Sequence, residues 1–257
     1  MKFTINATTF KNKLESLQVK GKHLTNKGFS NSNFGTNVYA SLQRNVLSLY
    51  NGDSIFLVKI AVEVPVPNVD GEVCFDSTML IPYLKSFKDE EIAFTADDYI
   101  TVSIGNKKAS IPKLVNHPNM EAVLILKNML SHVQYEPNPT TLWKFSNFNY
   151  EGAFSMTNNY FEACLKNCEL VKSGIYKLDF NNDVTFSTSE TVRNSYTETL
   201  SPVFRLGEPA TLQFSGALYS FFEKEQLLNF YVRDESPLLI VASDRMLMKA
   251  PHVGGNE

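Results

Sequence analysis

Seven lysines are the residues whose type and spacing could carry binding chemistry in this chain. They lie in or at the ends of four short segments in which apolar residues recur with helical spacing, and they lie off each apolar stripe. The seven are Lys11, Lys13, Lys20, Lys85, Lys88, Lys166 and Lys224. On a single helix such lysines usually form a solvated face. The alternative is that these lysines contact phosphate groups, because all four segments carry them in a chain of net charge −3. Such contacts would be independent of sequence and sensitive to salt.

Acidic residues reduce the basic character of the same segments. They are Glu15, Glu162, Glu169 and Glu223. We therefore expect any phosphate contact to be loose rather than tight.

Signals for catalysis and for metal binding are weak. Cys164 and Cys168 are four residues apart on one expected helix, but a metal site would need two more ligands, and the four histidines are scattered. Buried core cysteines are the favoured interpretation. The chain has no glycine-rich phosphate loop, no H-E-x-x-H motif and no nucleophile elbow, and its carboxylate pairs lie at expected turns. The sequence therefore predicts no enzyme activity, no metal and no cofactor.

Composition indicates a soluble globular protein with a sizeable core. The chain has 257 residues, of which 43% are hydrophobic and 20% charged. No apolar run is long enough to span a bilayer, and the N-terminus lacks the apolar stretch of a signal peptide. Three cysteines, an odd number, argue against a disulfide framework. We expect an intracellular protein in a reducing compartment, with no membrane partner.

Strand signals dominate the chain, as short runs rich in β-branched and aromatic residues separated by turn signals. The expected strands are 46–50, 55–64, 71–75, 92–95, 100–104, 142–148, 175–180, 184–187, 210–214, 228–232, 238–241 and 246–248. Helical spacing predicts four helices, around Phe10 to Leu17, from Ser77 as N-cap, after Thr157, and after Ser215.

The order of these elements is similar in the two halves. We therefore predict an α+β fold made of two similar domains, each with two helices packed on antiparallel sheets. The expected boundaries are a first domain at 1–115, a proline-marked linker at 116–140 and a second domain at 141–257.

Three stretches of the chain have a recognisable arrangement: 53–62 followed by 71–85, then 208–224, then 237–251 with its Ala250-Pro251 end. In these stretches and in its order of elements the chain resembles a DNA sliding clamp of the two-domain, proliferating-cell-nuclear-antigen type. The opening Met1-Lys2-Phe3-Thr4 is similar to the start of a bacterial beta clamp. That clamp has three domains per chain, whereas this chain has room for two.

The resemblance implies a closed ring formed by three chains joined head to tail, with helices facing a central hole and sheets outside. Such a ring is a processivity factor. It encircles double-stranded DNA without reading its sequence, it is placed there by a clamp loader, and it tethers DNA polymerase and other replication proteins. The seven lysines would then line the hole and contact DNA phosphates.

The resemblance also implies a hydrophobic pocket between the domains, which accepts a short peptide from a partner protein. The matching positions are Tyr50, Leu57, Leu124, Leu126, Pro237, Met248, Ala250 and Pro251. Met248 stands where an aromatic residue would be expected. Leu57, which lies in an expected strand, is also a natural core residue.

Two alternatives remain open at this point. The first is a clamp-like protein that forms no ring of its own, or joins a heteromeric ring, and modulates a host clamp. The second is an enzyme or small-ligand binder on an unrelated α+β fold. The oligomeric mass distinguishes a homotrimeric ring from both.

Overall fold

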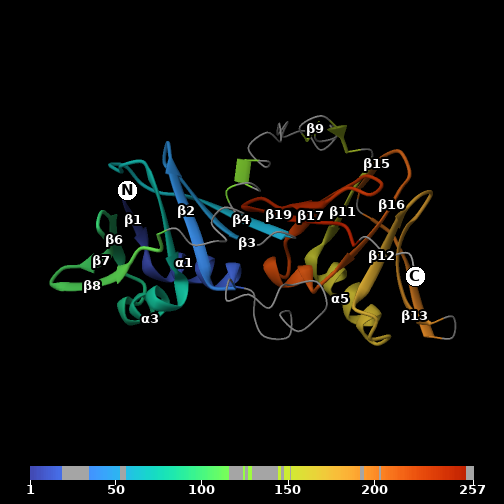
Figure 1. The fold of residues 1–257 in the computed structure, drawn as a ribbon, viewed down its shortest axis with the longest axis horizontal. Coiled ribbons are helices and arrows are strands. Elements are labelled where there is room, and N and C mark those ends of the chain that lie inside the picture. Colours follow the sequence, from blue (N-terminus) through green and yellow to red (C-terminus); the bar gives the residue numbers. More distant parts are fainter. Residues whose placement is uncertain are drawn as a thin grey trace. The chain divides into compact units, whose positions relative to one another are not determined.

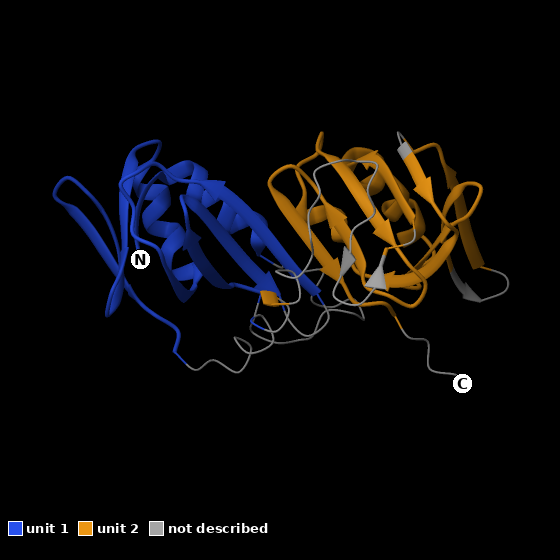
Figure 2. Cartoon of the chain, turned by 90° about the horizontal axis from the view of Figure 1, so that it is seen from above, with its two compact units in different colours: residues 1–20, 32–125 blue, residues 21–31, 126–257 orange. Residues whose placement is uncertain are grey.

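The computed structural model places most of the chain in two compact units (Figure 2). Unit 1 comprises residues 1–20 and 32–125, and unit 2 comprises residues 21–31 and 126–257. The residues that the structure describes are 1–18, 35–52, 56–115, 124, 127–128, 144–145, 148–150, 152–191, 194–202 and 204–252. Most of the expected linker at 116–140, together with Lys20 and Leu126, lies outside them.

The described part of unit 1 combines two antiparallel arrays of four strands with two helices of 11 residues each (Figure 1). Its elements are β1 (Lys2–Asn6), α1 (Ala7–Leu17), β2 (Asn37–Gln43), β3 (Val46–Gly52), β4 (Phe56–Glu63), β5 (Gly71–Asp76), α3 (Ser77–Phe87), β6 (Glu91–Ala96), β7 (Tyr99–Ile104) and β8 (Lys107–Pro112). The strands pair in the orders β1-β6-β7-β8 and β5-β2-β3-β4. The two helices pack against each other.

Unit 2 has the same kinds of element. They are β9 (Lys144–Phe145), β10 (Phe148–Asn149), β11 (Gly152–Thr157), α5 (Asn158–Glu169), β12 (Ile175–Phe180), β13 (Val184–Thr191), β14 (Asn194–Leu200), β15 (Phe204–Gly207), β16 (Ala210–Ser215), the 3₁₀ helix η1 (Leu218–Phe221), β17 (Leu227–Val232), β18 (Leu238–Val241) and β19 (Arg245–Lys249). The main orders are β11-β17-β18-β19 and β16-β12-β13-β14, and β15 pairs with the other edge of β11.

The two units repeat one topology. In each unit the first strand leads into a helix. Three strands then form a meander, and the strand after the meander pairs with the meander's first strand. Three final strands extend the sheet that contains the first strand of the unit. The pairing of β15 with β11 has a short counterpart in unit 1, where Lys2 and Val69 exchange backbone hydrogen bonds of 2.9 and 2.7 Å. This repetition confirms the predicted fold class of two similar α+β units.

A trio of phenylalanines at equivalent positions anchors each core. In unit 1, Phe3 on β1 stacks on Phe94 of β6 at 4.6 Å, and Phe10 of α1 meets Phe94 edge-on at 5.9 Å. In unit 2 the corresponding rings are Phe154, Phe230 and Phe161, with a stacked pair at 4.7 Å and an edge-on pair at 5.0 Å. All six side chains are almost fully buried. The number of residues between the phenylalanine of the first strand and that of the helix is the same in both units. The trios therefore define which residues of unit 1 and unit 2 are equivalent.

The predicted N-cap of α3 is wrong by one residue. Asp76, not Ser77, is the cap, and its carboxylate accepts the Thr78 N–H at 2.9 Å. Ser77 is the first helical residue and is buried, with its hydroxyl donating to the Thr36 carbonyl at 2.7 Å. Aspartate and serine are comparable as N-caps, so tertiary contact at Ser77 decides where the helix begins.

The fourth predicted helix, after Ser215, is also wrong, because only the four-residue 3₁₀ helix η1 forms there. Side chains from elsewhere occupy the carbonyls that a longer helix would need. The Asn158 amide donates to the carbonyls of Tyr219 and Phe222, each at 3.1 Å. Arg245 donates to the Phe221 carbonyl at 2.8 Å. A continued helix would lose these bonds, so Lys224 lies in a turn rather than on a helix.

Candidate functional site

Two of the candidate lysines of unit 1 pair with one carboxylate. Glu15 lies on α1, four residues after Lys11, and its two oxygens face different lysines. Lys11 Nζ is 3.6 Å from Glu15 Oε2, and Lys85 Nζ, from α3, is 3.3 Å from Glu15 Oε1. The Lys85 side chain is 59% exposed and that of Glu15 is 28% exposed. The packing of α1 on α3 therefore brings two positive charges to one negative charge on the helix surface.

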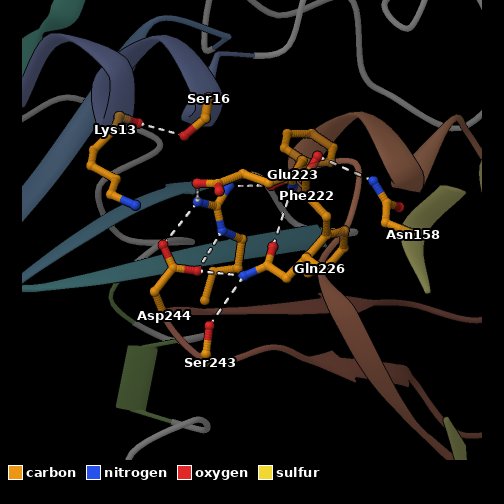
Figure 3. Close-up of polar contacts among 10 residues, drawn as sticks. Lys13, Ser16, Asn158, Phe222, Glu223, Gln226, Ser243 and Asp244 are labelled. Carbon is orange, nitrogen blue, oxygen red and sulfur yellow. Dashed lines mark hydrogen bonds and ion pairs between the residues drawn. The ribbon is translucent and has the colours of Figure 1, made fainter. Parts of the chain in front are cut away.

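Two further lysines of unit 1 lie near the same helix. Lys13 is half-exposed on α1, and its carbonyl accepts a 2.9 Å hydrogen bond from Ser16 Oγ (Figure 3). Lys88 is exposed and follows α3, with its carbonyl accepting from Thr8 Oγ1 at 3.2 Å, which places it at the N-terminus of α1. Asp89 and Glu90 follow it directly, so its charge is partly offset.

Lys166 of unit 2 has an acidic and aromatic environment. Its Nζ is 2.6 Å from Glu162 Oε1, one turn earlier on α5, and lies 5.8 Å from the centre of the Tyr219 ring. Burial raises the pKa of Tyr219 to about 12, and the negative charges of Glu169 and Glu162 add to that rise. Lys166 therefore lies beside the Glu162 carboxylate and the Tyr219 ring, with Glu169 one turn further along α5.

Lys224 is exposed in the turn that follows η1, and it is flanked by Glu223 and Glu225. Its carbonyl accepts the Asn159 N–H at 2.9 Å, so the turn lies against the N-terminus of α5. The Glu225 carboxylate accepts from the Asn159 side chain. Carboxylates are favourable at a helix N-terminus, and the acidic residues of this turn therefore have a structural reason to be there.

With the residues aligned by the phenylalanine trios, an acidic and a basic residue are interchanged between equivalent positions of the two units. Phe10 and Phe161 are equivalent, so the Lys11–Glu15 pair of α1 corresponds to the Glu162–Lys166 pair of α5. Both are i, i+4 ion pairs of opposite polarity. The order Glu then Lys is the more favourable one on a helix, and α5 has that order.

The candidate pocket residues of unit 1 differ in exposure. Leu57 is completely buried in β4, and Tyr50 in β3 is 7% exposed. Burial raises the pKa of Tyr50 above its ordinary value. Lys59 Nζ lies 5.9 Å from the centre of the Tyr50 ring. Leu124 is 36% exposed, which fits an apolar side chain that belongs to no core.

The candidate pocket residues of unit 2 lie on the final hairpin and just beyond it. The Pro237 carbonyl accepts from Tyr150 Oη at 3.0 Å, and Met248 is buried opposite Leu239 in the β18–β19 pair. Ala250 and Pro251 follow β19 and are half-exposed. Next to them, the His252 N–H donates to the Gln213 carbonyl at 2.7 Å, which ties the end of the hairpin to β16. Because the candidate residues belong to both units, the pocket remains a prediction.

A buried arginine that sequence analysis did not single out stabilises the same hairpin. Arg245 begins β19 and is 4% exposed. Its guanidinium donates to both carboxylate oxygens of Asp244 at 2.8 Å, to Glu223 at 2.9 Å and to the Phe221 carbonyl. The Gln226 amide donates to Asp244 at 2.7 Å and accepts the Glu223 N–H at 3.2 Å (Figure 3). These contacts join the turn before β19 to η1, and no local sequence pattern signals them.

The cysteines are core residues, as the sequence indicated. Cys74, Cys164 and Cys168 are free and buried. Burial raises the pKa of the Cys164 thiol to about 12 and that of Cys168 to about 11. Within the described ranges, no group of three or more histidine, cysteine or acidic side chains is placed to hold a metal ion. None of the helices in the described part of the chain is both long and hydrophobic enough to span a bilayer.

Comparison with protein-family models gives no match. Comparison with curated protein sequences also gives no match.

Comparison with solved structures gives matches along nearly the whole chain. The DNA polymerase III beta subunit of Thermotoga maritima has a TM-score of 0.74 and 13% identity, covering 99% of this chain and 66% of that one. The putative beta subunit of Eubacterium rectale gives 0.73, 12% identity, and 98% and 65% coverage. The A. fulgidus PCNA, solved with the C-terminal region of FEN-1, gives 0.68, 11% identity and 99% of both chains.

The chain therefore has the fold of the DNA sliding clamps, which confirms the resemblance at the level of fold. It spans about two thirds of the length of the bacterial beta subunits and the full length of the A. fulgidus PCNA. The clamp fold contradicts the alternative of an unrelated α+β fold.

Proposed function

We propose that this protein is a DNA sliding clamp, a processivity factor that encircles double-stranded DNA as a homotrimeric ring and performs no chemistry of its own. One observation carries the proposal: a chain of two topologically equivalent units matches a whole PCNA chain, end to end. An encircling ring stays on DNA without tight binding, so modest positive charge on its helices suffices. Tethered partners gain effective concentration at the primer end.

The ends of two strand arrays supply edges for ring closure. β8 is the last strand of one array in unit 1, and β14 is the last strand of one array in unit 2. We infer that β8 of one copy pairs with β14 of the next. This contact is heterologous, so it closes only when the rotation between copies divides a full turn. Pairing of the two edges would remove the template for aggregation that an open strand presents.

Mass in solution tests the ring. Light scattering or sedimentation over a range of concentrations is expected to give three times the 29.0 kDa mass of the chain. The trimer is also expected to increase the length of product made by its cognate polymerase on long templates. A strict monomer at high concentration without polymerase stimulation would contradict the proposal. Co-purification with a second clamp-like chain would favour the heteromeric alternative.

Partner proteins are proposed to dock a short hydrophobic motif near Leu124 and Ala250-Pro251. Two solved neighbours support this: the A. fulgidus PCNA is bound to the C-terminal region of FEN-1, and the Helicobacter pylori beta clamp is bound to a DNA ligase peptide. Here Leu124 and Pro251 offer exposed or half-exposed apolar surface. A clamp loader and a DNA polymerase are the expected partners.

The double substitution Leu124→Ala with Pro251→Ala tests this docking surface. We expect binding of a hydrophobic clamp-binding peptide to weaken about tenfold, since each position loses part of its buried apolar contact. Fluorescence anisotropy with a labelled peptide measures the change, and the oligomeric mass is expected to stay the same. Exposed Val66→Ala, on the β4–β5 connection, is the control and should leave peptide affinity unchanged. Equal peptide affinity for the double variant and the parent would place the docking surface elsewhere.

A further inference from the structure

We propose that nucleic-acid contact is concentrated on the helices of unit 1, and that the helices of unit 2 contribute little to it. The inference rests on the proposed function and adds to it which half of each chain touches the DNA. The two units differ in how their lysines are paired with carboxylates on the surface formed by the helices.

The unit 1 cluster is Lys11, Glu15 and Lys85. Two lysines share a single carboxylate, at 3.6 and 3.3 Å, so the cluster carries a net positive charge. A DNA phosphate approaching the cluster can replace Glu15 as the partner of either lysine. Release of counterions from the DNA then favours binding.

The equivalent cluster in unit 2 has the opposite balance. In place of Lys11 it has Glu162, in place of Glu15 it has Lys166, and Glu169 lies one turn further along α5. No lysine corresponds to Lys85, because η1 replaces the second helix. Burial raises the pKa of Tyr219, and the negative charges of Glu169 and Glu162 raise it further. A phosphate would meet two carboxylates and a lysine already engaged at 2.6 Å.

The other candidate lysine of unit 2 does not reverse this balance. Lys224 lies between Glu223 and Glu225 at the N-terminus of α5.

Two matched double substitutions test the inference, each removing two lysine charges. They are Lys11→Gln with Lys85→Gln in unit 1, and Lys166→Gln with Lys224→Gln in unit 2. Affinity for a short linear duplex is measured by fluorescence anisotropy at several salt concentrations. The unit 1 double is expected to weaken binding about tenfold and to reduce the magnitude of the salt slope by about 1 to 2. The unit 2 double is expected to change affinity by less than about twofold.

Substitution of Glu15 provides a test in the opposite direction. Glu15→Gln removes the carboxylate shared by Lys11 and Lys85 and is expected to strengthen duplex binding about threefold, with a steeper salt slope. Asp179→Asn is the matched control, because Asp179 pairs with Lys177 at 2.8 Å on β12 and its side chain is 22% exposed, close to the 28% of Glu15. This control is expected to leave duplex binding unchanged.

The outcomes separate the inference from the proposed function. Equal weakening by both doubles, or greater weakening by the unit 2 double, would overturn the assignment to unit 1 and leave the sliding clamp intact. An unchanged affinity in Glu15→Gln would also count against it. A parent protein that shows no salt-dependent association with duplex DNA would overturn the proposed function itself, and the inference with it. Unchanged oligomeric mass and thermal unfolding in every variant exclude misfolding as the cause.

Discussion

Replacing Phe230 by alanine is expected to lower the free energy of unfolding of unit 2 by about 4 kcal/mol. The Phe230 ring is fully buried, stacks on Phe154 at 4.7 Å and meets Phe161 edge-on at 5.0 Å. Truncation therefore removes apolar burial, two aromatic contacts and the filling of a tightly packed space. Phe94→Ala is expected to have a similar effect on unit 1, because Phe94 has the same partners in register there.

Urea unfolding followed by circular dichroism measures the loss, and amide hydrogen exchange locates it. In Phe230→Ala, exchange is expected to accelerate in β11, α5 and β17, while the core strands of unit 1 keep their protection. Leu227→Ala on the same strand is the control. Leu227 is 47% exposed, so its truncation is expected to cost less than about 0.5 kcal/mol. A cost below about 1 kcal/mol for Phe230→Ala would refute the central role of the trio.

Arg245→Met is expected to destabilise unit 2 by about 3 kcal/mol. Methionine is similar in length but leaves the Phe221 carbonyl and the Asp244 carboxylate without their guanidinium partner. A buried acceptor without a donor costs free energy that the apolar side chain does not recover. Arg245→Lys is expected to recover part of this stability only, because an ammonium cannot reproduce the two parallel bonds to Asp244.

Thermal and urea unfolding measure this effect, with Lys177→Met as the control for loss of an exposed ion pair. The Lys177 side chain is 44% exposed and lies 2.8 Å from Asp179, and exposed pairs contribute less than about 1 kcal/mol. If both substitutions had the same small effect, the buried hydrogen bonds of Arg245 would not contribute to the stability of unit 2. Faster exchange of the β18–β19 amides in Arg245→Met would show that the arginine stabilises the final hairpin.

The sequence alone was sufficient for the class of fold and for most of the elements. Strands such as 175–180 and 238–241 were predicted because their β-branched and aromatic residues mark buried strands. Strands β1, β2, β8, β11, β14 and β15 were not predicted. β14, for example, contains mainly polar residues and is exposed along much of its length, so its hydrogen-bonded neighbour, rather than its composition, makes it a strand.

Local pattern was insufficient where side chains from distant segments compete for the backbone. The apolar spacing after Ser215 predicts a helix, but Asn158 donates to the carbonyls of Tyr219 and Phe222. Arg245 donates to the Phe221 carbonyl, and only one 3₁₀ turn forms. Serine at position 77 fits an N-cap, but contact with Thr36 draws it into the helix. In both places the competing group is far away in sequence, and only the tertiary structure brings it close.

The same distinction holds for the candidate DNA surface. Helical period alone predicts which lysines lie off the apolar stripes, since it separates one face of a helix from the other. The sequence also shows the glutamates among them. How these charges are paired depends on the folded chain, because Glu15 meets Lys85 through the packing of α1 on α3. The equivalence of the two units, with the ion-pair polarity exchanged between them, likewise depends on register across strands and not on sequence identity.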